Sequence, residues 1–312
     1  MIADGNLQDL VKIYINFLKT RHFAQETLEA KIYKLKHFTE YISKQGVKNV
    51  LEITKDIILD YQIQNCETLN KTGKANTVAH QNSLLGNVKQ FMDFLYTYDY
   101  IAHDPSKGIS YAKKPRQLPR SILTQTEMRK ILQSPDTKTT IGYRDRTVLE
   151  VLYSTGIRKS ELNNLKLSDV DYNEGYLRII SGKGGKDRVV PLGKIACRYL
   201  ENYIKGVRCE LAKGPKNDYL FLTSQGEKFY RCMLCNLVKK YAKAAKIKKN
   251  VHPHMFRHTC ATDLLKNKAN IRVIQEFLGH ASITSTQIYT HLTIAEIKEV
   301  HKRCHPREQD NF

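Results

Sequence analysis

Five short segments in the second half of the sequence carry side chains that suit the cleavage of a phosphodiester. In chain order they are YSTGIRKSELNNL with Arg158 and Glu161, SGKGGKD with Lys183, HPHMFRHTCAT with His254 and Arg257, FLGHAS with His280, and TQIYTHL with Tyr289. A phosphodiester resists attack because its anionic oxygens repel a nucleophile, and two guanidiniums bind such oxygens while staying charged at any working pH. A tyrosine hydroxyl supplies a nucleophile, and histidine and lysine transfer the protons that bond cleavage requires.

Each of these residues also has an ordinary structural explanation. Arg158 alone would be a surface arginine, His280 after Leu-Gly fits a helix end, and Tyr289 is one of 18 tyrosines. The segment GKGGKD fits a hairpin turn and does not match the GxxxxGK[ST] pattern of an ATP-binding loop. The argument therefore depends on the order and spacing of the five segments and not on any residue by itself.

The spacing of the segments is specific. It is 25 residues from Arg158 to Lys183, 23 from Arg257 to His280 and 9 from His280 to Tyr289. In this arrangement the segments resemble the motifs T-G-x-R-x-S-E-L, G-K-G-x-K-x-R, H-x-x-R-H, L-G-H and a downstream tyrosine of the tyrosine recombinase (lambda-integrase-like) family, and within it the bacterial Xer-type proteins. The helical first half and the segment KEVHKRCHPR also look Xer-like. The resemblance spans essentially the whole chain and implies site-specific exchange of strands between two duplex DNA sites.

The resemblance implies a role for each matched side chain. Tyr289 would attack the phosphorus and form a 3′-phosphotyrosine, leaving a free 5′-hydroxyl. His254 would accept the phenol proton and Lys183 would protonate the leaving 5′-oxygen. Arg158 and Arg257 would bind the phosphate. In this family neither a metal ion nor a nucleotide cofactor is required.

The remaining matched residues are expected to support this chemistry. His280 would donate a hydrogen bond to the phosphate, and Glu161 would orient the cationic residues or balance their charge. Lys183 has basic neighbours, and the family spacing favours it over them as the proton donor. The residues expected to contact the DNA are Lys113, Lys114, Arg116, Lys186 and Arg188.

The charge of the chain supports a polyanionic partner. Its 312 residues include 51 lysines and arginines against 31 acidic residues, a formal net charge of +20. Residues 1–115 hold 15 basic and 12 acidic side chains, so nearly all of the excess lies in residues 116–312. A domain this basic attracts nucleic acid. The expected partners are specific double-stranded DNA sites and, from the resemblance, a homotetramer on DNA, with or without a second recombinase or accessory protein.

The first hundred residues are predicted to form a small helical bundle. Apolar residues recur at helical spacing through 10–18, 28–42, 53–63 and 78–98, with no strand-like alternation. The following stretch KGISYAKKPRQLPR has two prolines and five basic residues, which disfavour helix and burial. We therefore expect a helical domain at 1–110, which the resemblance identifies as a core-binding (SAM-like) DNA-binding domain, a basic linker at 111–120 and a catalytic domain at 121–312.

The catalytic half is predicted to be mixed α/β and mostly helical. Thr124 followed by Glu127 predicts a helix start, and GYLRII, SGKGGKD and RVVPL predict a hairpin. Further helices are expected at 141–153, 195–211, 229–245, 254–266, 271–277 and 294–301. In the tail, Leu292, Ile294, Ile297 and Val300 fall near one helix face. The resemblance favours docking of this face on a neighbouring protomer over docking on its own domain.

The cysteines and the hydropathy suggest a reducing compartment. Seven scattered cysteines, an odd number, argue against a disulfide framework. Cys232 and Cys235 form a CxxC with His252 and His254 nearby, so a zinc site is an alternative, although the helical pattern favours two small buried residues. No uncharged apolar stretch is long enough to span a membrane, and the first residues lack the form of a signal peptide. These features predict a cytoplasmic protein.

Three other functions compete with this interpretation. A type IB topoisomerase uses similar chemistry but rejoins the original strands, and the compact first half and the Xer-like tail disfavour it. A catalytically inert DNA-binding protein is disfavoured by the intact set of matched residues. A metal-dependent nuclease would need a cluster of carboxylates, which the sequence does not display. The sequence therefore predicts a mainly helical, two-domain tyrosine recombinase.

Overall fold

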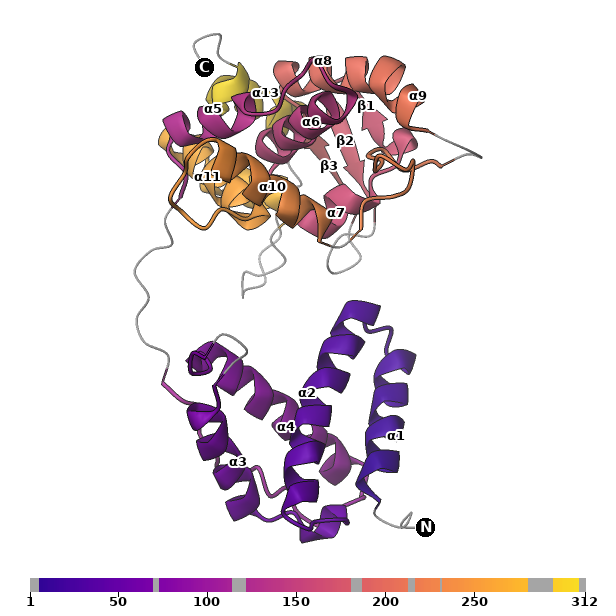
Figure 1. The fold of residues 1–312 in the computed structure, drawn as a ribbon, viewed down its shortest axis with the longest axis vertical. Helices are drawn as coiled ribbons and strands as arrows, with labels where there is room; N and C mark the ends of the chain where they lie inside the picture. The colour runs from indigo at the N-terminus through magenta and orange to yellow at the C-terminus, as the bar shows by residue number, and fades with distance from the viewer. Residues whose placement is uncertain are drawn as a thin grey trace. The chain divides into compact units, whose positions relative to one another are not determined.

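The computed structural model describes residues 6–69, 73–113, 122–180, 187–212, 217–230, 232–279 and 294–308 (Figure 1). The chain forms two compact units, Met1–Leu118 and Pro119–Phe312, and each has its own hydrophobic core. In the part of the chain described here, no helix is both long and apolar enough to cross a membrane.

The first unit is a helical bundle, as predicted. Its described helices are α1 (Leu7–Thr20), α2 (Gln25–Lys44), the 3-10 turn η1 (Val50–Glu52), α3 (Lys55–Glu67) and α4 (Val78–Thr97). Thr54 and Thr77 cap α3 and α4, because their side chains accept a hydrogen bond from a backbone N–H of the first turn. Phe38 on α2 and Phe91 on α4 are fully buried, whereas Ile32 on α2 is 42% exposed. The apolar pattern of α2 therefore includes one residue outside the core.

The second unit has the predicted mixture of helices with a small antiparallel sheet. Its helices are α5 (Gln125–Gln133), α6 (Thr140–Thr155), α7 (Lys159–Asn164), α8 (Lys194–Asn202), α9 (Arg208–Leu211), α10 (Met233–Ala244), α11 (Pro253–Lys266), α12 (Ile271–Leu278) and α13 (Ile294–Cys304). Strands β1 (Val170–Asp171), β2 (Tyr176–Ile179) and β3 (Arg188–Pro191) are paired in that order, with Ile179 opposite Arg188. The sequence predicts the β2–β3 hairpin but not β1, which is only two residues long and follows the 3-10 turn η2 (Leu167–Asp169). The hairpin tip, 181–186, lies outside the described residues.

Helix α6 is the central helix of the second unit. Its residues from Arg144 to Thr155 are all buried, and α8 and α11 pack against it. The hydroxyl of Tyr153 donates a hydrogen bond of 2.7 Å to Asp263 on α11, which ties these two helices together. The helix ends at Gly156, whose φ of 56° lies in the left-handed region that glycine adopts without strain. This turn carries the chain directly into Arg158.

One predicted helix is interrupted. The segment 195–211 consists of α8, a π-helical turn η3 (Tyr203–Val207) and α9. Tyr203 is fully buried at the start of that turn, where its hydroxyl donates to the Leu220 carbonyl at 3.1 Å and accepts from the Leu222 N–H at 3.3 Å. Because the apolar spacing of the segment is that of an ordinary helix, periodicity alone does not predict the π-helical turn.

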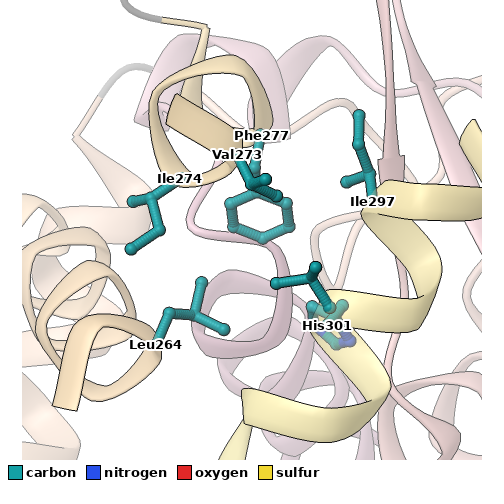
Figure 2. A pocket seen from close by; sticks show the side chains of 7 residues that line it. Leu264, Val273, Ile274, Phe277, Ile297 and His301 are labelled. Carbon is teal, nitrogen blue, oxygen red and sulfur yellow. The ribbon is translucent and has the colours of Figure 1, made fainter. Parts of the chain in front are cut away.

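The described tail of the chain packs against its own unit. Ile297 on α13 is buried in the core. A small apolar pocket between α11, α12 and α13 (Figure 2) is lined by Leu264, Val273, Ile274, Phe277, Ile297, Val300 and His301. In the 3-10 turn η4 (Pro306–Glu308), Arg307 donates to both carboxylate oxygens of buried Glu150 on α6, at 3.0 and 2.6 Å. The described part of the tail thus packs on its own unit, and its docking on a neighbouring protomer stays a prediction. Leu292 lies outside the described residues.

Candidate active site

Arg158 stands at the start of α7 and is tied to the first turn of that helix. Its backbone N–H donates to Glu161 Oε2 at 2.7 Å, and its Nη1 donates to Glu161 Oε1 at 2.9 Å. Arg158 is the residue before the helix, and Glu161 lies in its first turn. A carboxylate in the first turn of a helix also faces the positive end of the helix dipole.

Glu161 is a buried carboxylate with every oxygen occupied. Besides Arg158 it binds Arg188, whose Nη1 and Nη2 donate to Oε1 and Oε2 at 2.9 and 2.8 Å, so the carboxylate accepts four hydrogen bonds. Burial opposes its ionisation, but the hydrogen bonds from Arg188 and from the Arg158 backbone outweigh burial and lower the pKa of Glu161 to about 2. Glu161 is therefore a fixed negative charge that holds two arginines, and it is not a proton acceptor.

Arg257 lies one turn into α11, whose start is marked by Pro253 in its first turn. The side chain is buried, and it joins the ends of two other helices. Its Nη1 donates to the carbonyl of Gly156 at the end of α6, at 2.8 Å, and its Nη2 donates to the carbonyl of Leu278 at the end of α12, at 2.6 Å. Burial, followed by the charge of Arg158, lowers the pKa of Arg257 to about 10. The guanidinium is still protonated at neutral pH.

The end of α12 holds both phosphate-binding candidates. Arg158 Nη2 donates to the carbonyl of Gly279 at 2.7 Å, next to the Leu278 carbonyl that binds Arg257. Gly279 has a φ of 66°, the left-handed conformation typical of a residue that ends a helix. Carbonyls at a helix C-terminus carry partial negative charge, so they favour two cations that otherwise repel each other. His280 directly follows Gly279 in sequence but lies outside the described residues.

His254 is exposed on α11, one turn before Arg257. Partial desolvation, followed by the charges of His252 and His258, lowers the pKa of His254 below its usual range. A lowered pKa keeps the imidazole neutral at neutral pH, which leaves a ring nitrogen able to accept a proton. This is the property that the predicted general base requires.

The structure thus brings together part of the predicted set. Arg158, Glu161 and Arg257 share one cluster, and Arg188, predicted to contact DNA, joins it through Glu161. Lys113 is exposed in the first unit. The predicted residues Lys183, Lys186, His280, Tyr289, Lys114 and Arg116 lie outside the described residues. Side-chain types do not predict the carbonyls of Gly156, Leu278 and Gly279 that bind these arginines, although the two glycines mark the helix ends where the carbonyls lie.

The CxxC pair shows no metal-binding arrangement. Among the described residues, no group of three or more histidine, cysteine, aspartate or glutamate side chains could hold a metal ion. The prediction that both cysteines are buried was wrong for Cys232, which is exposed just before α10, while Cys235 is half-buried within that helix. The helix begins one residue after Cys232, so that side chain does not follow the helical burial pattern.

Comparisons with known proteins agree on one family. The sequence model of the phage integrase family matches residues 121–296. Two relatives named tyrosine recombinase XerD, from Staphylococcus haemolyticus and Staphylococcus aureus, are each 33% identical over 304 residues, which is 96% of this chain and 100% of theirs.

Solved structures show the same fold. The XerH site-specific recombinase bound to difH substrate is 24% identical with a TM-score of 0.64, covering 93% of this chain and 82% of that one. A lambda integrase tetramer bound to a Holliday junction is 19% identical with a TM-score of 0.65, covering 91% and 80%.

The second unit thus combines the mainly helical fold of the lambda integrase structure with a cluster of arginines at the end of α12. The chain belongs to the phage integrase family, and it is a tyrosine recombinase, a DNA strand-transferring enzyme. The sequence motifs predict a tyrosine recombinase, and these comparisons confirm that prediction.

Proposed function

We propose that this recombinase exchanges strands between two specific duplex DNA sites through a covalent bond to Tyr289. The observation that carries the proposal is the pair of arginines from separate segments, Arg158 and Arg257, held on consecutive carbonyls at the end of α12. Each guanidinium uses two nitrogens to bind protein groups and keeps further N–H donors for a ligand. Such a fixed pair suits the two non-bridging oxygens of one phosphate.

In the cleavage step, each of the remaining matched residues has its own role. The hydroxyl oxygen of Tyr289 attacks the phosphorus, and His254 accepts the phenol proton. The bond from phosphorus to the 5′-oxygen breaks while Lys183 donates a proton to that oxygen, which leaves as a hydroxyl. His280 donates a hydrogen bond to the phosphate. The same steps in reverse join the 5′-hydroxyl of a partner strand and release Tyr289.

The charge balance of the cluster favours an anionic ligand. Among the residues that the structure describes, these three arginines, Arg158, Arg188 and Arg257, share one ionised carboxylate, that of Glu161. The partial negative charge at the ends of α6 and α12 offsets only part of this excess. A phosphate that enters the cluster therefore meets a net positive field, and the charge that develops on its oxygens in the transition state is stabilised.

We expect both units of the chain to bind DNA. Residues 1–110 would form a core-binding domain and residues 121–312 the catalytic domain, with the basic linker between them along the DNA backbone. Lys113, Lys114, Arg116 and Lys186 would contact phosphates, and affinity should fall steeply with salt. The assembly would be a tetramer on DNA, as in the lambda integrase structure, and the enzyme would work in the cytoplasm. The tyrosine recombinase relatives favour strand exchange over relaxation by a topoisomerase.

A suicide substrate tests the covalent step. A duplex nicked next to the cleavage point lets the freed 5′ fragment diffuse away, so the protein stays attached to the 3′-phosphate. The unmodified protein should form this adduct, and Tyr289→Phe should bind the same DNA yet form none. Tyr230→Phe, which removes the hydroxyl of a 58% exposed tyrosine in the same unit, serves as the control and should form the adduct normally. An adduct that persists in Tyr289→Phe, or that maps to another tyrosine, would refute the assignment.

A further inference from the structure

Arg188 does not have the surroundings of a residue that reaches out to DNA. It is the first residue of β3, and its side chain is only 13% exposed. Its two terminal nitrogens make a parallel pair of hydrogen bonds to the two oxygens of Glu161, at 2.9 and 2.8 Å. This two-point geometry fixes both the position and the rotation of the carboxylate plane.

The other side of the Arg188 guanidinium is pressed against the end of α12. A Cβ atom placed on Gly279 would lie 2.9 Å from Arg188 Nε and 3.0 Å from its Cδ, closer than such atoms come. Arg188 Nε is buried and has no hydrogen-bond partner among the described residues. Packing between Glu161 and Gly279 therefore leaves this side chain little freedom to turn towards another ligand.

Both neighbours of Arg188 also bind Arg158. Glu161 accepts from the Nη1 of Arg158, and the carbonyl of Gly279 accepts from its Nη2. Among the described residues, the two groups that bind the Arg158 guanidinium, Glu161 and the Gly279 carbonyl, thus also lie against Arg188. Arg188 also follows the hairpin segment 181–186 and is five residues from Lys183 in sequence.

We propose that Arg188 is a positioning residue for strand cleavage, which acts through Glu161 on the orientation of Arg158 and does not contact a DNA phosphate. The proposal rests on the proposed function, since it concerns the phosphate-binding role of Arg158. Without Arg188, the Glu161 carboxylate loses the two-point contact that fixes its plane and is held, among the described residues, by the two hydrogen bonds from Arg158. The guanidinium that it holds is then no longer fixed against the phosphate. The loss should appear in the rate of cleavage and not in the affinity for DNA.

The test compares Arg188→Met and Arg188→Lys with the unmodified protein under single-turnover conditions on the suicide substrate. Methionine keeps a long unbranched side chain without charge, and lysine keeps the charge without the two-point geometry. We expect the cleavage rate constant of Arg188→Met to fall about 10- to 100-fold, the usual effect of removing a residue that orients a ligand-binding group. Arg188→Lys should recover part of this loss. The amplitude, which reports the fraction of folded enzyme, should stay close to that of the unmodified protein.

A double-mutant cycle with Glu161→Gln tests whether Arg188 affects the cleavage rate through Glu161. If Arg188 acts through Glu161, the further loss caused by Arg188→Met in a Glu161→Gln background should be much smaller than in the unmodified protein. Arg178→Met, on the exposed face of the neighbouring strand β2, is the matched control and should show neither the rate loss nor the coupling. Fully additive effects of the two substitutions would overturn the proposal.

The salt dependence of DNA binding separates positioning from phosphate contact. A residue that neutralises one phosphate contributes about 0.9 to the slope of log affinity against log salt. Arg188→Met should leave this slope unchanged, whereas Lys186→Ala should reduce it by about that amount. A reduced slope for Arg188→Met with a normal cleavage rate of bound DNA would show that Arg188 is a phosphate contact. If the unmodified protein forms no adduct at all, the proposed function itself fails, and this outcome is distinct from failure at Arg188.

Discussion

Arg158 and Arg257 donate hydrogen bonds to consecutive backbone carbonyls, those of Gly279 and Leu278, at the end of α12. The separation of the two guanidiniums is therefore set by one peptide unit and not by two flexible side chains. Like charges held this close repel each other, and the partial negative charge of the helix end offsets that repulsion. A pair of cations fixed in this way is what the proposed electrostatic stabilisation of a phosphate requires.

Replacing Arg257 with lysine should show how much this geometry matters. A lysine keeps the charge, but one ammonium cannot bond both Gly156 and Leu278 and still present a planar fork to the phosphate. We expect Arg257→Lys to lower the single-turnover cleavage rate about 100-fold or more, with DNA affinity changed much less. Arg208→Lys is the matched control, since Arg208 is also buried and also binds backbone carbonyls, those of Asn217, Tyr219 and Leu220, in another part of the unit. Equal rate losses in both variants would point to general destabilisation.

The sequence predicts most of the helices, and it predicts that Arg158 and Arg257 belong to one set, because each is marked by a recognisable pattern of side chains. Helical periodicity indicates α1 to α4, the Thr124–Glu127 pair indicates the start of α5, and both partners of its capping box are present. The motif around Arg158 and the motif around Arg257 indicate one catalytic set. Their roles in catalysis, like the division of DNA binding between the two units, stay predictions.

The contacts that hold the cluster could not be predicted. Backbone carbonyls such as that of Leu278 leave no signature in a sequence. Arg188 looks like a surface residue because it follows a lysine- and glycine-rich turn, and its burial depends on Glu161 and Gly279, which are distant in sequence. The docking of the tail was equally open, since an apolar stripe shows that a helix is covered but not by which chain.

The proton donor can be identified with a modified substrate. Lys183→Ala should slow cleavage severely, because an unprotonated 5′-oxygen is a poor leaving group. A substrate with sulfur in place of the bridging 5′-oxygen needs little protonation, so it should largely restore the rate of this variant. Lys186→Ala is the control and should show no comparable rescue. Rescue of Lys186→Ala but not of Lys183→Ala would mean that the neighbouring lysine is the donor.

Cleavage should not depend on a metal ion or on ATP. In the proposed mechanism Arg158 and Arg257 would supply the positive charge that a metal would otherwise bring to the phosphate. The carboxylate of Glu161 is already bound by Arg158 and Arg188. We expect the adduct yield on the suicide substrate to be unchanged after dialysis against excess EDTA. Loss of the adduct on chelation, restored by magnesium or zinc, would overturn the arginine-based mechanism and return attention to Cys232 and Cys235.

The tail contains a histidine whose protonation should weaken the catalytic unit. His305 is fully buried, and its Nε2 faces the carbonyl of Tyr153 at 3.3 Å while its Nδ1 accepts the backbone N–H of Arg307 at 3.2 Å. Both nitrogens are therefore satisfied by the neutral ring, and a second proton on Nδ1 would point at a donor. Burial, followed by the charge of His301, whose ring stacks on it at 4.6 Å, lowers the pKa of His305 well below its usual range.

The sign of the pH effect follows from that lowered pKa. The folded unit holds His305 neutral, whereas the unfolded chain takes up a proton below about pH 6.5, so the stabilisation is complete above that pH and is lost as the pH falls. Between pH 6 and pH 5 the free energy of unfolding should therefore fall through this residue. The chain contains no tryptophan, so hydrogen exchange of peptides from α6 across a urea series is the suitable measurement.

His305→Asn keeps a donor and an acceptor but does not titrate, and it should flatten the pH dependence of the free energy of unfolding at some cost in stability. His258→Asn, at an exposed position on α11, should leave the dependence as it is. An equally steep fall in the His305→Asn variant would show that another group takes up the proton.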